Sequence, residues 1–261
     1  MDEENIPTCN QPPDFNISVW RYMDFTKFVS MLTRRGLFFS RLDRLGDPFE
    51  GSFPKLNTQD EYQPVDPSIL DPEGFIRSMK GLRQCIKFMR QWVYVNCWCW
   101  YMSEYESAAM WSLYTRTNEA ICIRSTFIDL QKQLPKNASL QCVDYIDYNN
   151  ETLPKRNEIW PFSQKRKSFE HENEVRAMIF DQSKGLLSWS SKIGTVPKSV
   201  IPPEPPESGI WVDVNLTELI DEVYVAPASP KWFKETVEQT IQKFDFKFPV
   251  VQSSLDDSPV W

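Results

Sequence analysis

The chain has 261 residues, of which 41% are hydrophobic and 25% are charged, and these fractions are those of an ordinary globular protein. Its formal net charge of −7 argues against a general nucleic-acid binding face, which needs clustered basic residues. Aromatic residues make up 14% of the chain, and disordered proteins are poor in these residues. We therefore expect a folded protein.

The sequence contains no apolar run of about 18 residues, so no transmembrane helix and no membrane partner are predicted. The acidic start, Met-Asp-Glu-Glu-Asn, lacks the apolar stretch of a secretory signal. The six cysteines are therefore expected to be free thiols of a cytoplasmic protein. His171 is the single histidine, and no metal is expected.

The first hundred residues are predicted to begin the sheet. A flexible N-terminal tail over 1–16 precedes a strand at 17–22, which is rich in β-forming residues. A helix follows over 25–34, capped by Asp24 and ended by Gly36. Next in order are a strand at 37–40, a loop at 43–51, an irregular stretch at 52–72, a helix at 72–92 and a strand at 93–100.

The rest of the chain is predicted to continue the same sheet. In order, we expect a helix at 106–114, a strand at 120–124 followed by a helix, strands at 142–148 and 172–180, a Pro-rich loop at 182–209, strands at 212–214 and 222–225, a helix at 230–244 and a strand at 248–251. No repeat or linker interrupts this order. The fold class is therefore predicted to be α+β, with one domain over 17–255 and a central mixed or antiparallel sheet flanked by helices.

A run of acidic residues lies at the start of the strand predicted at 172–180. If this strand begins early enough, Glu170, Glu172, Glu174 and Arg176 share one face, because side chains alternate along a strand. Carboxylates this close repel each other, so at least one is expected to have a raised pKa. The alternative is a solvent-exposed charged edge that Arg176 partly neutralises.

Three other charged features have both a structural and a functional interpretation. Arg21 lies in the first predicted strand, where a guanidinium needs an anion or a carboxylate partner. Asp47 precedes a proline, and this order is typical of a turn. The basic run at 165–167 is interpreted as a solvated helix face.

Trp111 and Tyr114 lie on the helix predicted at 106–114. Aromatic residues at helical spacing usually belong to a core, and the alternative is a stacking wall for a base or a nicotinamide ring. The sequence has neither a Walker loop nor a Gly-x-Gly-x-x-Gly motif, which excludes ordinary P-loop and Rossmann proteins. A single histidine also argues against a Ser-His or Cys-His triad.

Taken in order, several short motifs resemble a bacterial family, the domain of unknown function 2971. The resemblance covers roughly residues 18–255, and Gly46 stands where the family usually has Asn. The motifs are Trp20-Arg21-Tyr22, Leu37-Phe38-Phe39-Ser40, Gly46-Asp47-Pro48-Phe49-Glu50, Cys97-Trp98-Cys99, Met110-Trp111-Ser112-Leu113-Tyr114, Val143-Asp144-Tyr145, Phe169 through Arg176, and Val223-Tyr224-Val225-Ala226-Pro227.

The order of an arginine in the first strand, a helix, a Gly-Leu-x-Phe-Ser strand and a late Glu-x-Glu also resembles the ADP-ribosyltransferases. This resemblance implies NAD, a nucleotide-type small molecule, as the substrate and requires no metal. It implies that Glu174 stabilises the oxocarbenium-like transition state and that Glu172 orients or deprotonates the acceptor. The residues that would bind NAD are Arg21 at the pyrophosphate, Ser40 at the nicotinamide ribose, Tyr22, Trp111 and Tyr114 around the leaving ring, and Asp47 and Arg176 beside them.

The predicted function is therefore that of an NAD-dependent ADP-ribosyltransferase or an NAD glycohydrolase-like enzyme in bacterial defence or toxin biology. The acceptor macromolecule is open, and so is enzymatic activity itself. One alternative is a metal-dependent nuclease, with Asp47, Glu50, Glu172 and Glu174 around Mg²⁺. The other is a non-catalytic binding or sensor module.

Overall fold

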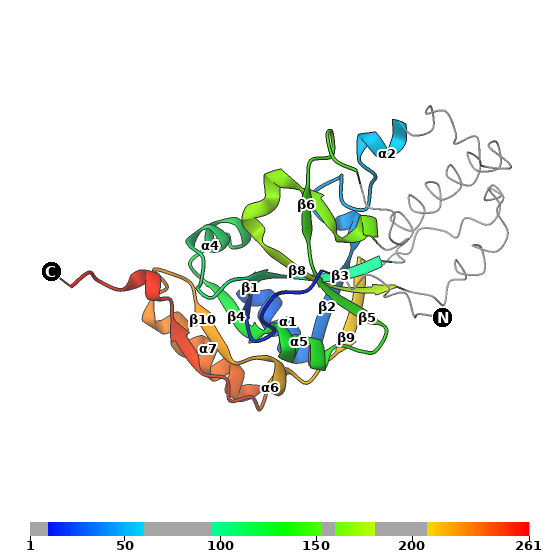
Figure 1. Cartoon of the computed structure of the whole chain (residues 1–261). Coiled ribbons are helices and arrows are strands. Elements are labelled where there is room, and N and C mark those ends of the chain that lie inside the picture. Colours follow the sequence, from blue (N-terminus) through cyan, green and yellow to red (C-terminus); the bar gives the residue numbers. More distant parts are fainter. Residues whose placement is uncertain (1–9, 60–94, 153–159, 181–207, 261) are drawn as a thin grey trace, which may run out of the picture.

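The computed structural model describes residues 10–59, 95–152, 160–180 and 208–260 (Figure 1). These residues form a single α+β domain with a nine-stranded mixed sheet flanked by helices. The strands are β1 (Ser18–Asp24), β2 (Gly36–Arg41), β3 (Val95–Met102), β4 (Ala120–Thr126), β5 (Ala138–Cys142), β8 (Glu174–Phe180), β9 (Gly209–Asp213), β10 (Glu222–Val225) and β11 (Val250–Gln252). The predicted fold class is confirmed.

The helices connect and cover these strands. They are α1 (Phe25–Arg34), α2 (Lys55–Gln59), α4 (Ala108–Tyr114), α5 (Phe127–Gln133), α6 (Leu216–Leu219) and α7 (Lys231–Lys243), with short 3-10 turns η1 (Leu42–Arg44), η3 (Trp160–Ser163), η4 (Lys167–Glu172) and η8 (Ser254–Asp256). A separate parallel pair is formed by β6 (Asp144–Ile146) and β7 (Gln164–Arg166). Among the helices of the described residues, none is long and apolar enough to cross a membrane.

Strand β3 lies at the centre of the sheet, and two strands share one of its sides. β8 pairs with β3 along the whole stretch from Val95 to Tyr101. On the other side, β2 pairs near Cys97 and β1 pairs near Tyr101. The sheet is therefore split between β1 and β2, opposite the middle of β3.

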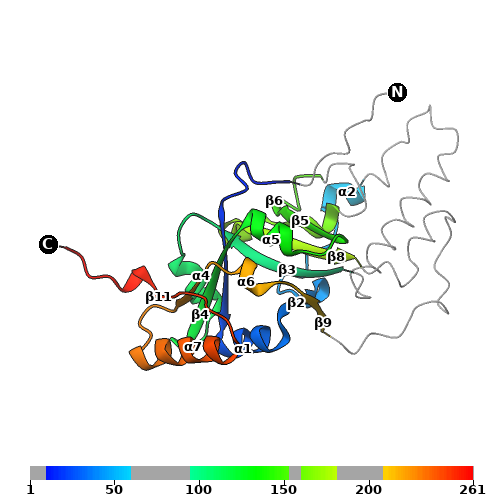
Figure 2. The same cartoon turned by 90° about the horizontal axis from the view of Figure 1, so that it is seen from below.

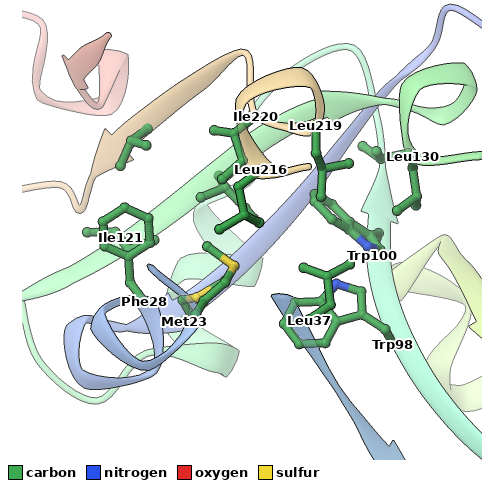
Figure 3. Packing of buried hydrophobic residues seen from close by; sticks show 14 of the residues in the cluster. Met23, Phe28, Leu37, Trp98, Trp100, Ile121, Leu130, Leu216, Leu219 and Ile220 are labelled. Carbon is green, nitrogen blue, oxygen red and sulfur yellow. The ribbon is translucent and has the colours of Figure 1, made fainter. Parts of the chain in front are cut away.

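One face of the sheet carries the main hydrophobic core, which packs against the helices (Figure 3). Alternation places Trp98 and Trp100 of β3 on this face, where they meet side chains such as Leu37 and Leu130. Figure 2 shows α1 and α7 side by side along this core, and Phe25 of α1 stacks edge-to-face on Phe233 of α7. The opposite face of β1, β3 and β8 carries two smaller buried clusters, which include Tyr22 and Trp111 in one and Cys97 and Met178 in the other.

Most predicted strands and helices lie where the structure has them, with differences at their ends. The helix at 25–34 has the predicted bounds, but the Asp24 side chain makes no capping hydrogen bond. Arg35, not Gly36, takes the left-handed conformation at its end, with φ of 49°. The strand expected at 142–148 is not a single strand, because β5 ends at Cys142 and the separate strand β6 covers only Asp144–Ile146.

Other differences lie in segments whose sequence shows no clear helical or strand spacing. The short helices α2 and α6 were not predicted, and α2 falls in the stretch expected to be irregular. The helix expected at 72–92 and most of the Pro-rich loop at 182–209 lie outside the described residues. Residue Asn10, in the predicted tail, accepts a hydrogen bond from the Cys142 backbone at 2.7 Å.

Replacing Gly36 with alanine is expected to lower the free energy of unfolding by about 1–3 kcal/mol. A Cβ atom at Gly36 would lie 2.5 Å from the carbonyl oxygen of Val212 in the paired strand β9, so the backbone would have to move. Gly46→Ala is the matched control, because a Cβ there meets nothing within 4 Å. Urea unfolding measures both, and equal stabilities for the two variants would contradict the expected close approach of β2 and β9.

Candidate functional site

A pocket lies on the face of the sheet opposite the main core, where β1 and β3 meet α4 and the start of β8. It encloses about 30 Å³, which is room for about two water molecules, and the rest of its space is open to solvent. It is lined by Trp20, Arg21, Tyr22, Cys99, Trp100, Tyr101, Met110, Tyr114, Glu172 and Glu174. The lining residues therefore include two carboxylates, several aromatic rings and one arginine.

Strand register places the acidic part of the pocket. Glu174 pairs with Tyr101 and Arg176 pairs with Cys99, so both β8 side chains lie on the pocket face of the sheet. The backbone N–H of Glu174 donates to the hydroxyl oxygen of Tyr145 at 2.8 Å, which attaches the first residue of β8 to the small β6–β7 pair.

Glu172 reaches the same pocket from a turn and not from a strand. It ends the 3-10 turn η4, and Asn173 then takes a left-handed conformation with φ of 35° before β8 begins. The prediction that Glu170, Glu172 and Glu174 alternate along one strand is therefore wrong. Glu170 is exposed on η4, whereas Glu172 is buried beside Glu174.

Behind the pocket wall, two cations bind three carboxylates in a buried cluster. Nζ of Lys165 donates to Glu172, and it lies 3.2 Å from Glu174 and 3.6 Å from Glu50. Nε of Arg176 donates to Glu174 at 2.6 Å, and its Nη2 lies 2.7 Å from Glu50. Arg176 is completely buried, and its Nη1 also donates to the carbonyl oxygen of Phe162.

The pKa values in this cluster follow from burial and from the two cations. Burial acts to raise the pKa of Glu174, but Arg176 and Lys165 outweigh it and lower this pKa to about 2. Burial also raises the pKa of Glu50, with Arg176 acting in the opposite direction. Burial disfavours the charged Lys165, but Glu174 and Glu50 outweigh it and raise its pKa. Glu174 and Lys165 are therefore ionised at neutral pH, and the predicted repulsion does not raise the pKa of Glu174.

The cluster has an excess of negative charge. Three carboxylates and two cations give a formal charge of −3 + 2 = −1 when all are ionised. Glu172 and Glu174 line the pocket, whereas Lys165 and Arg176 lie behind them. The pocket therefore presents carboxylate oxygens to a ligand, with positive charge further away.

The aromatic side of the pocket is rigidly held. The Tyr22 ring packs edge-to-face on Trp111 with centroids 4.9 Å apart, and its hydroxyl oxygen accepts from the Ser107 N–H at 2.8 Å. Trp111 in turn donates its indole N–H to Glu106 at 2.9 Å. Tyr114 is 40% exposed and lies at the mouth of the pocket. Burial raises the pKa of both tyrosines, so their rings are neutral.

Arg21 lies where the sheet is split. Its Nη1 donates to the carbonyl oxygen of Cys99 at 2.6 Å, and the guanidinium lies over the Trp98 ring at 5.0 Å from the centroid. Among the described residues, no carboxylate forms an ion pair with Arg21, and its Nε is buried without a hydrogen-bond partner. A backbone carbonyl and an aromatic ring therefore take the place of the carboxylate partner that the sequence suggested.

The structure brings most of the predicted site residues together. Lining the pocket are Arg21, Tyr22, Tyr114, Glu172 and Glu174, while Arg176 and Trp111 lie directly behind this lining. Two residues lie elsewhere. Ser40 lies on β2 and pairs with Cys97 of β3. Asp47 forms an ion pair with Arg166 at 2.9 Å and accepts a hydrogen bond from the Phe49 N–H.

Sequence reasoning missed the residues that organise the cluster. Lys165 belongs to β7 and is 6% exposed, so the prediction of a solvated helix face at 165–167 is wrong for this residue. Cys99 and Tyr145 were also not proposed as site residues, and no local spacing points to them. Glu50 was considered only as a metal ligand, and it could have been found as the acidic end of the Asp-Pro-Phe-Glu motif.

The four acidic residues proposed for a nuclease are divided between two places. Glu50, Glu172 and Glu174 contact Lys165, whereas Asp47 contacts Arg166. Within the described residues, no group of three or more His, Cys, Asp or Glu side chains is arranged to hold a metal ion.

No protein-family model matches the chain, so its resemblance to the domain of unknown function 2971 stays a prediction. No curated protein matches it significantly. Two solved structures resemble it over most of both chains. Thermus sp. 2.9 DarT in complex with carba-NAD⁺ has 12% identity and a TM-score of 0.37, covering 93% of this chain and 97% of that one. DarT of the same organism in complex with ADP-ribosylated ssDNA has 9% identity and a TM-score of 0.38, covering 94% and 97%. Identities and TM-scores this low establish no shared function.

Proposed function

We propose that the chain cleaves the bond between nicotinamide and ribose in NAD and transfers the ADP-ribose to an acceptor or to water. The observation that supports this most strongly is the carboxylate of Glu174. This carboxylate is buried, is kept ionised by two cations, and lines a pocket that also has aromatic side chains in its wall.

The pocket suits the nicotinamide ring of NAD before reaction. This ring carries a positive charge in the oxidised dinucleotide, and aromatic faces and carboxylates both attract cations. Tyr22 and Tyr114 supply the aromatic surface, and Glu172 and Glu174 supply the negative charge. The enclosed part of the pocket is only about 30 Å³, so this proposal places the edge of the nicotinamide ring against these side chains and the rest of NAD outside the pocket.

The same carboxylate suits the transition state. Loss of nicotinamide leaves positive charge on the ribose, and a fixed anion stabilises charge that develops only in the transition state. Glu174 is fixed by Arg176 and Lys165 before substrate binds, so it needs no reorganisation. Glu172 shares the Lys165 ammonium with it, and we assign to Glu172 the role of orienting or deprotonating an acceptor.

The remaining predicted residues take more limited roles in this proposal. Arg21 belongs to the pocket lining, but its guanidinium lies over the Trp98 ring on the core face of the sheet, so we assign it no contact with the pyrophosphate. Trp111 supports the Tyr22 ring from behind, and Arg176 holds Glu174. Ser40 and Asp47 lie outside the pocket lining and receive no role.

Incubation of the purified protein with NAD, followed by chromatography of free nicotinamide, tests the proposal. Release above the rate of the protein-free control, together with thermal stabilisation by NAD, is the expected result. Absence of both, with cell lysate added as a source of acceptors, would refute the proposal.

The charge of the pocket also predicts a preference among dinucleotides. We expect NAD⁺ to bind at least about fivefold more tightly than its deamidated analogue or NADH, because their nicotinic or reduced rings have no net positive charge beside Glu172 and Glu174. Ligand-induced shifts in melting temperature at low salt measure the difference. Equal affinities for all three dinucleotides would place the nicotinamide end away from the carboxylates.

A further inference from the structure

We propose that Lys165 is a positioning residue for this reaction, whose ammonium holds the Glu172 and Glu174 carboxylates side by side on the pocket wall. This inference rests on the function proposed above. Lys165 does not line the pocket, so it acts through the two carboxylates that do.

The contacts of Lys165 carry the inference. β7 pairs in parallel with β6, with Lys165 opposite Tyr145, and this pair brings the ammonium against the first residue of β8. Its Nζ donates to Glu172 and lies 3.2 Å from Glu174. It also lies 5.0 Å from the centroid of the Phe169 ring. With Glu50 at 3.6 Å, these make four contacts of one buried ammonium, which leave it little freedom to move.

Arg176 cannot replace Lys165 in this role. Arg176 contacts Glu174 and Glu50, and among the described residues the ion pair of Glu172 is with Lys165 alone. Without the ammonium, Glu172 and Glu174 would face each other as adjacent buried anions. One of them would then turn away from the pocket or bind a proton at a higher pH than before.

The ionisation of Glu174 is set by groups from every element around it. These are Lys165 on β7, Arg176 on β8, Glu50 in the loop after β2, Glu172 on η4, Cys99 on β3, Tyr145 on β6 and Tyr114 on α4. Lys165 and Arg176 are the positive ones among them. Removing Lys165 therefore takes away one of two charges that keep Glu174 ionised.

The direction of the pH effect follows from the sign of the shift. The pKa of Glu174 is lowered to about 2, so the wild type keeps this carboxylate ionised throughout the weakly acidic range. In Lys165→Met the pKa of Glu174 rises, and the ionised fraction falls as the pH is lowered. We expect the pH at which nicotinamide release falls to half its maximum to move up by about one unit or more.

The experiment records the pH profile of nicotinamide release for the wild type, Lys165→Met, Lys165→Arg and Lys167→Met. Lys165→Arg retains a positive charge and is expected to restore part of the wild-type profile. Lys167→Met is the matched control, because Lys167 is exposed and pairs with Glu151 outside the pocket. A Lys165→Met profile with the wild-type shape but lower amplitude would overturn the inference, since a merely structural residue changes amplitude alone.

A second measurement separates this inference from the proposed function. Carbon NMR titration of the Glu174 carboxyl group needs no activity, and we expect its pKa to be higher in Lys165→Met than in the wild type. If Lys165→Met does not fold, Lys165→Gln, which removes the charge but keeps a polar side chain, is titrated instead, with the same expectation. An unchanged Glu174 pKa would overturn the inference. Absence of nicotinamide release by the wild type, with this pKa still raised in the variant, would overturn only the proposed function.

Discussion

Glu174→Gln is expected to lower the rate of nicotinamide release from NAD at least about a hundredfold. Glutamine keeps the size and shape of the side chain but removes the negative charge that would face the developing positive charge on the ribose. The loss is expected in kcat more than in KM, because Tyr22, Tyr114 and Glu172 remain to bind the ground state. Steady-state kinetics with chromatographic detection of nicotinamide measures both parameters.

Glu170→Gln is the matched control for this variant. It makes the same chemical change four residues earlier, at an exposed position on η4 that does not line the pocket. We expect its rate to equal that of the wild type. A Glu174→Gln variant as active as Glu170→Gln would show that another group stabilises the transition state, and it would refute the role assigned to Glu174.

Arg176→Met is expected to have the largest effect on stability, lowering the free energy of unfolding by about 3–5 kcal/mol. The guanidinium is completely buried and contacts the carboxylates of Glu50 and Glu174 at 2.7 and 2.6 Å. Removing it leaves two buried carboxylates with Lys165 as their remaining cation, and the Phe162 carbonyl loses a donor. Urea unfolding at neutral pH measures the loss.

The loss is expected to shrink in acid. A carboxylate with a lowered pKa stabilises the folded state above its unfolded pKa of about 4.3, and this contribution disappears as the pH falls through its folded value of about 2. The difference in free energy of unfolding between the wild type and Arg176→Met is therefore expected to decrease as the pH falls from about 4.3 to about 2.

Arg124→Met is the matched control for Arg176→Met, because Arg124 pairs with Glu222 at 3.1 Å while both side chains are about one-third exposed. We expect it to cost less than about 1 kcal/mol. Similar losses for the two variants would mean that the buried cluster is no more important for folding than a surface pair.

Much of the sheet and part of the site could be predicted because their signals are local. The strand at 17–22 and the helix at 25–34 follow from β-forming residues and helical spacing, which act over a few neighbours. Glu174 and Arg176 share a face because they are two residues apart on one strand, and this required no knowledge of the fold.

The rest of the site depends on contacts between distant segments. The basic run around Lys165 predicts a surface residue. Only the pairing of β6 with β7 and the burial of three acidic partners place Lys165 in the middle of the charged cluster. Ser40 was expected at the site, but β2 joins β3 at Cys97, whereas the pocket is lined from Cys99 to Tyr101. The split between β1 and β2 separates Ser40 from the pocket, and no local sequence pattern predicts where a sheet splits.

The release of nicotinamide from ring-labelled NAD by the wild type, Glu174→Gln and Glu170→Gln tests the central claim most directly. The three proteins are compared at equal concentration, with and without cell lysate as a source of acceptors. We predict release by the wild type and Glu170→Gln, and a rate near the protein-free background for Glu174→Gln. Equal release by all three proteins, or none by the wild type under any condition, would contradict the claim that the Glu174 pocket carries out chemistry on NAD.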